Sequence, residues 1–289
     1  ANFLDADYES VGARVVSKRD EVFSVANVLL TMHSIGSTSD QMNSDLDMLQ
    51  SGQVLVGLLD PLGNPKAVRE LADTGIMSFA LELLPRITRA QPMDVLSSMA
   101  TVAGYKGALM AADLLPRMYP MMITAAGTIT PAKVLVLGAG VAGLVAIATS
   151  RRFGAVVQAY DIRPAVREQV VSLGAKFLDI ELTISDTETS SGYARDMGTE
   201  FYLRQRDLMK QAVVESDVVI ATAAVPGGKA PVLITGDMVE GMRSGSVVVD
   251  LAAGSGGNCE LTKAEERLSV GGVTIVGPTN LPSSIPYHA

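Results

Sequence analysis

Three glycines at fixed spacing carry the most specific chemical signal in this sequence. Residues 133–143 read KVLVLGAGVAG, so Gly138, Gly140 and Gly143 follow a short apolar run in a GxGxxG pattern. The first glycine of such a pattern permits a tight turn, the second lets backbone approach a pyrophosphate, and the third lets a helix pack closely on a strand. The helix that follows offers unpaired N–H groups and the positive end of its dipole to phosphates. The pattern therefore predicts a dinucleotide site.

An aspartate further along the chain indicates which dinucleotide binds. The apolar run 156–160 ends at Asp161, which lies 21 residues after Gly140. Folds of this kind place at that point a carboxylate that binds the ribose hydroxyls of the adenosine. Because a carboxylate repels a 2′-phosphate, NAD(H) is favoured over NADP(H).

A second group of polar residues precedes the helix that we expect from about Met93 to Leu115. The segment 85–94 reads PRITRAQPMD and contains Arg86, Arg89, Gln91 and Asp94. On residue types alone, the simpler interpretation is a solvated helix cap in which Asp94 complements the helix dipole.

Other chemistry has little support in the residue types. The serines have no histidine partner within reach in the sequence, which disfavours nucleophilic catalysis. The chain has two histidines, His33 and His288, and one cysteine, Cys259, so we expect no metal site and no internal disulfide. A lone cysteine fits a reducing compartment.

The elements that must position these groups alternate between short apolar runs and helical segments. We expect strands at 13–16, 28–32, 54–59, 77–80, 134–137, 156–161, 176–178, 218–221, 246–250 and 273–276. We expect helices at 18–26, 39–50, 64–75, 141–153, 164–173, 200–215 and 235–242. This alternation predicts an α/β fold of two Rossmann-like domains with parallel sheets and a cleft between them. Ligands of such sheets bind at the carboxyl ends of the strands.

We place the N-terminal Rossmann-like domain at 1–100 and the NAD(H)-binding Rossmann domain at 101–289. The polar stretch 179–199 has little apolar periodicity and is expected to be a long functional or mobile loop.

Composition narrows the class of protein. Of the 289 residues, 48% are hydrophobic and 19% charged, so a large core can form and disorder is not expected. The net charge of −8 argues against a nucleic-acid surface. The apolar stretch 134–149 falls short of the ~20 residues that a bilayer span needs and fits a buried strand with its helix. The chain begins without Met or a signal segment, so we expect an excised or trimmed piece.

Three long stretches of the sequence resemble a known family. They are 81–107 (LELLPRITRAQPMDVLSSMATVAGYKG), 119–177 (which contains VLVLGAGVAG and AYDIRP) and 230–262 (APVLITGDMVEGMRSGSVVVDLAAGSGGNCELT). They resemble the NAD(H)-binding domain I, in the alpha subunit, of proton-translocating nicotinamide nucleotide transhydrogenase. The resemblance covers nearly the whole chain. Alanine dehydrogenase is the related family with the same two-domain fold.

The resemblance gives the polar segment a function in place of a cap. It implies that Arg86, Gln91 and Asp94, with Ser97 nearby, hold the nicotinamide end in the catalytic site. It also places Tyr193 on a mobile loop that closes over nucleotide. The expected cofactor-binding residues are Gly138, Gly140, Val141, Gly143, Asp161, Ile162, Arg163, Tyr193, Thr222, Asn258 and Asn280. The family's first domain has a further initial strand and helix and a closing helix, so the first domain here is expected to be incomplete.

Departures from the relatives bear on the reaction. Alanine dehydrogenases carry a lysine, a histidine and an aspartate at positions that correspond to Leu30, Leu58 and Gly254. Without the lysine and the histidine, oxidative deamination lacks the groups that bind the substrate carboxylate and move a proton. Two alternatives stay open: an alanine dehydrogenase-like NAD-dependent oxidoreductase, and a non-catalytic NAD-binding module.

The resemblance implies direct hydride transfer between NADH and NADP⁺ held on a separate domain. The implied partners are an NADP(H)-binding domain and a membrane proton-channel domain of the same enzyme, together with a second copy in a homodimer. Nucleic acid is not among the expected partners. The implied location is a soluble domain peripheral to a membrane, at the cytoplasmic face of a bacterial inner membrane or the matrix face of a mitochondrial one.

Overall fold

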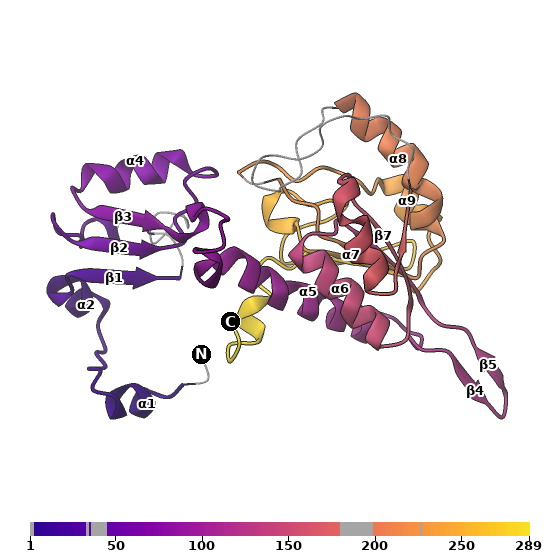
Figure 1. Ribbon diagram of the computed structural model, residues 1–289, viewed down its shortest axis with the longest axis horizontal. Coiled ribbons are helices and arrows are strands. Elements are labelled where there is room, and N and C mark those ends of the chain that lie inside the picture. The colour runs from indigo at the N-terminus through magenta and orange to yellow at the C-terminus, as the bar shows by residue number, and fades with distance from the viewer. Residues whose placement is uncertain (1–2, 33–34, 36–44, 180–198, 226) are drawn as a thin grey trace. The chain divides into compact units, whose positions relative to one another are not determined.

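The computed structural model describes residues 3–32, 35, 45–179, 199–225 and 227–289 (Figure 1). The chain divides into two compact units, Ala1–Leu96 and Ser97–Ala289. Among the described residues, no helix is long and apolar enough to cross a membrane. The predicted fold of two Rossmann-like units with parallel sheets is confirmed.

The first unit is built on a small parallel sheet in the order β1-β2-β3. Its pairing aligns Val28 with Val54 and Val54 with Met77. The strands are β1 (Val28–Thr31), β2 (Val54–Gly57) and β3 (Met77–Ala80), and the helices are α1 (Asp5–Ser10), α2 (Arg19–Val25) and α4 (Pro65–Asp73). Helix α4 begins with proline at its first position, and the side chain of Asn64 caps it by accepting from Ala67 N–H.

One expected strand of this unit is wrong. Residues 13–16 form irregular backbone rather than a strand, and Val15 is 39% exposed. Half of the helix expected at 39–50, residues 39–44, lies outside the described residues, and only 45–46 of the described half are helical. Helix α1 was not predicted.

The sheet of the first unit is packed on one face. The core combines Phe23, Leu29, Leu55 and Leu71 with two neighbours, and all of these are nearly fully buried. Side chains that alternate with them point the other way, and Leu30 is 80% and Phe79 52% exposed. A strand places successive side chains on opposite faces, so these exposures mark a solvent-facing apolar surface.

The second unit holds a seven-stranded sheet in the order β11-β12-β10-β9-β6-β7-β8. All neighbours pair in parallel except β11 with β12. Starting from β6, the parallel strands follow the 3-2-1-4-5-6 order of dinucleotide-binding sheets. The strands are β6 (Lys133–Leu137), β7 (Val156–Tyr160), β8 (Lys176–Phe177), β9 (Val218–Ala221), β10 (Val247–Asp250), β11 (Arg267–Val270) and β12 (Val273–Val276). Each parallel strand of this set was predicted, whereas β11 was not.

Helices cover both faces of this sheet (Figure 1). Val134 and Val136 of β6 pack into one core cluster with residues of α5 (Val95–Leu114), α6 (Val141–Arg152) and α7 (Arg167–Ser172). Leu135 and Leu137 point to the opposite cluster, which includes residues of α8 (Thr199–Val214) and α9 (Gly236–Gly241). Both faces of β6 are therefore buried, which explains its continuous apolar run.

Two further features of this unit bear on the site. Gly104 of α5 lies so close to α6 that an added Cβ would come within 3.0 Å of the carbonyl oxygen of Ala142. Strands β4 (Met122–Thr124) and β5 (Gly127–Ile129) form an antiparallel hairpin, which was not predicted. The hairpin reaches away from the body of its unit (Figure 1), and Ile123 is 83% exposed. Short 3₁₀ helices occur at Leu81–Leu83, Gln91–Met93, Pro164–Val166, Ala253–Ser255 and Pro282–Ser284.

Candidate functional site

The glycine turn joins the end of β6 to the start of α6. Gly138 has φ +94°, a left-handed conformation that favours glycine, and its missing side chain leaves room for Thr222. A Cβ at Gly143 would lie within 3.0 Å of the carbonyl oxygen of Gly138. The first and third glycines thus do what the pattern predicts: one turns the chain and the other brings the helix onto the strand.

Gly140 differs from the other two because it faces open space. It is the residue before α6, its backbone is extended, and an added Cβ would meet nothing within 4 Å. Val141 then begins a helix of 12 residues, whose first N–H groups have no acceptor within the helix. An open approach to a helix N-terminus fits the pyrophosphate of a dinucleotide, which is the group the second glycine is expected to admit.

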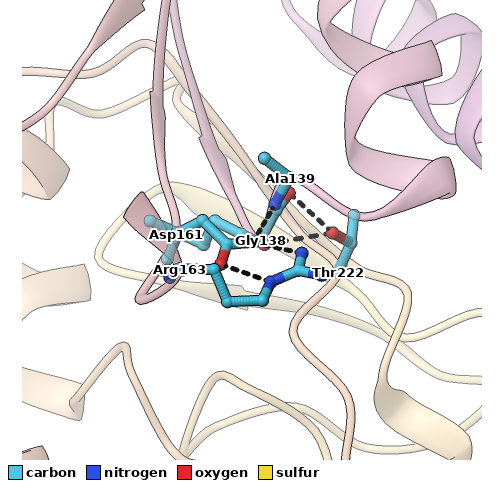
Figure 2. A network of polar contacts seen from close by, with 6 residues as sticks. Gly138, Ala139, Asp161, Arg163 and Thr222 are labelled. Carbon is cyan, nitrogen blue, oxygen red and sulfur yellow. Dashed lines mark hydrogen bonds and ion pairs between the residues drawn. The ribbon is translucent and has the colours of Figure 1, made fainter. Parts of the chain in front are cut away.

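Asp161 lies at the end of β7, directly against this turn (Figure 2). Its Oδ2 accepts a hydrogen bond from Ala139 N–H at 2.7 Å, and its Oδ1 accepts one from Arg163 N–H at 2.9 Å. The carboxylate therefore holds the glycine turn to the neighbouring strand, besides standing where a ribose-binding acid is expected.

The guanidinium of Arg163 donates two hydrogen bonds to the same carboxylate. Nε donates to Oδ1 at 2.9 Å and Nη2 donates to Oδ2 at 2.8 Å, the bidentate arrangement of arginine with a carboxylate (Figure 2). The two side chains are 12% and 6% exposed. This ion pair was not predicted, although Arg163 itself was expected near the cofactor.

Thr222 connects the next strand, β9, to the turn. Its Oγ1 lies 3.0 Å from the carbonyl oxygen of Gly138 and 3.2 Å from that of Leu137, where a hydroxyl can donate to either (Figure 2). The carboxyl ends of β6, β7 and β9 are therefore linked by polar contacts at the glycine turn.

Asn258 lies beneath the surface and binds backbone. Its side chain accepts from Ala223 N–H at 2.9 Å and donates to the carbonyl oxygens of Ala223 and Pro231, each at 2.8 Å. The residue is fully buried. Its amide joins the loop after β9 to the loop after β10, so the structure shows a residue that positions these loops. Its direct contact with a cofactor stays a prediction.

Asp250 anchors the same region from the end of β10. Its carboxylate accepts from the backbone N–H groups of Ala252, Asn258 and Cys259 at 3.0, 2.8 and 2.9 Å. Burial raises the pKa of this carboxyl above its ordinary value, against the opposing effect of the N–H donors. Asp250 was not predicted as a site residue, although an acid that ends an apolar strand is the same signal that identified Asp161.

The remaining predicted site residues lie in different places. Arg86 and Gln91 are exposed, and Asp94 is half-buried in front of α5, all within the first unit. Ser97 is half-buried in the first turn of α5 and belongs to the second unit. Asn280 is exposed, and its Oδ1 accepts from Ser283 Oγ at 2.9 Å. Ile162 is partly buried against the core, and Tyr193 lies outside the described residues.

The three positions at which the chain is expected to depart from alanine dehydrogenases carry side chains without acid–base chemistry. Leu30 is exposed on β1, and Leu58 follows β2 and is half-buried. Gly254 is exposed, and an added Cβ would make only ordinary contacts with Thr279 at 3.8 Å. Space alone therefore does not explain the glycine at 254.

Known proteins match the whole chain. The family model described as alanine dehydrogenase/PNT, N-terminal domain, matches residues 1–103, and the corresponding C-terminal domain matches 107–289. The first part of the NAD(P) transhydrogenase alpha subunit of Rickettsia prowazekii is 43% identical over 285 residues, which are 99% of this chain and 74% of that protein. The crystal structure of transhydrogenase from Sinorhizobium meliloti superposes with a TM-score of 0.85 at 44% identity, over 99% of this chain and 76% of that one. Alanine dehydrogenase 2 of Staphylococcus aureus is 27% identical, over 98% of this chain and 70% of its own length.

Proposed function

Because the chain belongs to the alanine dehydrogenase/PNT family, we propose that it is the NAD(H)-binding part of a proton-translocating NAD(P) transhydrogenase. The observation that carries this proposal is the 43% identity to transhydrogenase alpha subunits over almost the full chain, against 27% to an alanine dehydrogenase. The predicted resemblance to the transhydrogenase and the prediction of NAD(H) as cofactor are confirmed by the same matches.

The second unit holds the nucleotide. The open backbone at Gly140 and the start of α6 take the pyrophosphate, and Asp161 accepts hydrogen bonds from the ribose hydroxyls of the adenosine. Thr222 and Asn258 form hydrogen bonds that hold the loops next to the glycine turn in place. The bound nicotinamide supplies the hydride chemistry, and the protein's task is to bind and orient it.

The nicotinamide end is held by four residues, of which three lie in the polar segment 85–94 and one at the start of α5. Arg86 and Asp94 can form a charged pair that fixes the orientation of a side chain, and Gln91 can bond the carboxamide or the ribose. Ser97 is the fourth residue of this set. Tyr193, which lies outside the described residues, is a further residue that we expect to contact the nucleotide. Direct hydride transfer to NADP⁺ held on a partner domain would need no general acid or base.

The complete enzyme adds an NADP(H)-binding domain and a membrane proton-channel domain, and this chain assembles as a homodimer. It lies peripheral to the membrane, at the cytoplasmic face in bacteria or the matrix face in mitochondria. The names of the relatives, which describe one portion of an alpha subunit, support an assembly with further subunits.

The decisive experiment mixes this chain with an NADP(H)-binding partner domain and follows hydride transfer between NADH and an NADP⁺ analogue. We expect transfer in the mixture and none from either component alone. Turnover of pyruvate or alanine with NAD(H) would instead favour the alanine dehydrogenase-like alternative.

A pair of arginine variants distinguishes catalysis from mere binding. Arg86→Ala is expected to slow hydride transfer in the mixture. Arg89→Ala removes another exposed arginine three residues away and should leave the rate near that of the wild type. If NADH binds but Arg86→Ala leaves transfer unchanged, the non-catalytic NAD-binding module becomes the better interpretation.

A further inference from the structure

The carboxylate of Asp161, which is expected to bind the ribose, already accepts hydrogen bonds from four donors of this chain. Oδ1 accepts from Arg163 N–H and Nε, and Oδ2 accepts from Ala139 N–H and from Arg163 Nη2. A carboxylate offers about four lone-pair sites, so ribose hydroxyls can donate to Asp161 only if a donor leaves. The two backbone donors are fixed by the turns, so one hydrogen bond from the guanidinium must give way to a ribose hydroxyl, while the positive charge of Arg163 stays beside the carboxylate.

We propose that Arg163 is a specificity-determining residue that offsets the repulsion of Asp161 toward a 2′-phosphate. This inference rests on the proposed function, in which Asp161 faces the ribose of the adenosine. Discrimination between NAD(H) and NADP(H) is then set by the Asp161–Arg163 pair rather than by Asp161 alone.

The charges of the two side chains support this assignment. A lone buried aspartate would meet a 2′-phosphate with a full negative charge, which is the basis of NAD(H) preference in such folds. Here a guanidinium lies 2.8 Å from the carboxylate and both side chains are nearly buried, so the pair is close to neutral when seen from the ribose position. Guanidinium groups also bind phosphate in the same bidentate way, and an arginine near this position accommodates the 2′-phosphate in NADP-binding proteins.

The local backbone explains why the pair forms. Arg163 follows Asp161 by two residues, and its own N–H already donates to Oδ1, so the turn after β7 folds the arginine back over the acid. The next arginine along the chain, Arg167, instead pairs with Asp179, and both of those side chains are more than half exposed. Arg163 is thus the arginine placed to neutralise Asp161.

The test measures binding with two probes that differ by one phosphate, 5′-AMP and adenosine 2′,5′-bisphosphate, alongside NADH and NADPH. Isothermal titration of the wild-type chain and its variants yields the ratio of the dissociation constant of the 2′-phosphorylated probe to that of the unphosphorylated one. Effects common to both probes, such as attraction to the pyrophosphate site, cancel in this ratio.

Arg163→Gln is expected to raise the ratio roughly threefold to tenfold, because the uncompensated carboxylate now repels the 2′-phosphate through a partly screened medium. Arg163→Lys keeps the charge and should hold the ratio within about twofold of the wild type. Asp161→Asn should lower it. The control Arg243→Gln removes the same charge from an exposed arginine whose carboxylate partner, Asp217, precedes β9 at the opposite end of the strands, and it should leave the ratio unchanged.

An unchanged or lower ratio in a folded Arg163→Gln variant would overturn the assignment. If that variant does not fold, as judged by circular dichroism, a ratio that departs more than about threefold in Arg163→Lys would do the same, because lysine preserves the charge. Failure of the wild-type chain to bind either NADH or 5′-AMP would count against the proposed function itself, and so the two failures are distinguishable.

Discussion

The two sheets of this protein are built from the same alternation of strands and helices, but the side chains of their strands are buried to different degrees. In the second unit, Ile220 and Val248 are fully buried because helices cover both faces of the sheet. In the first unit, Leu29 and Leu55 are buried while Leu30 and Phe79 on the other face are exposed. The same residue types thus serve a two-sided core in one sheet and a one-sided core in the other. Stability and nucleotide binding should accordingly respond to mutation in different ways in the two units.

The largest contrast is expected from deleting one aliphatic side chain in each sheet. Ile220→Ala removes a fully buried side chain from the central strand β9 and should lower the free energy of unfolding of its unit by about 2–5 kcal/mol. Leu30→Ala, at 80% exposure, should change stability by no more than about 0.5 kcal/mol. Guanidinium denaturation followed by circular dichroism measures both. Equal losses would show that the first sheet is covered in solution.

The next contrast lies within the glycine turn. Gly143→Ala forces a Cβ against the Gly138 carbonyl and should cost about 1–3 kcal/mol of stability through overpacking. Gly140→Ala meets open space and should cost less than about 1 kcal/mol, yet it should weaken NADH binding about tenfold, the equivalent of one hydrogen bond to a charged group. Denaturation and NADH titration separate the two effects. A Gly140→Ala variant that binds NADH normally would remove this residue from the pyrophosphate site.

The two units each contain a buried aspartate paired with arginine, and this allows a matched test of Asp161. Asp161→Asn should weaken NADH binding by on the order of 1–3 kcal/mol, the cost of losing hydrogen bonds to a charged group. Asp45, which pairs with Arg19 at 2.7 Å in the first unit, provides the control. Asp45→Asn should leave NADH affinity unchanged in the same titration. Unchanged affinity in Asp161→Asn would show that this carboxylate does not face the ribose.

The smallest effect is expected at Thr222. Thr222→Val keeps the shape but removes the hydroxyl that can donate to Gly138 and Leu137, so stability should fall by roughly 0.5–1.5 kcal/mol. Thr128→Val, on the exposed β4–β5 hairpin, serves as a comparison and should have no measurable effect. Thermal unfolding resolves this difference. Equal stability of the two variants would show that the Thr222 hydroxyl does not stabilise the turn.

The second sheet was the more predictable one, because strands that are buried on both faces appear in the sequence as continuous apolar runs. Runs such as 134–137, 218–221 and 247–249 are wholly apolar and could be assigned to strands without ambiguity. The run 13–16 is also apolar in part, yet it is not a strand, because strand formation depends on a partner and on packing that the residues themselves do not encode. Strand β11 was missed for the converse reason: its sequence, RLSV, carries only a short alternation.

The site was predictable in its backbone and less so in its side-chain pairing. Gly138, Gly143 and Asp161 are positioned as their spacing predicts, because the turn and the strand end are local features. The Arg163 ion pair depends on how the turn after β7 folds back, and the burial of Asn258 depends on two loops that are far apart in sequence. Neither the ion pair nor the burial of Asn258 follows from the spacing of residues in the sequence.

The antiparallel strand β11 has a consequence for the solubility of the second unit. It covers the edge of β12, and its outward positions include Arg267, which is exposed. At the other end of the sheet, β8 pairs through only two residues. Charged or very short outer strands offer a poor template for a strand of another molecule. The sheet that is richest in aliphatic residues therefore ends on both sides in ways that discourage aggregation.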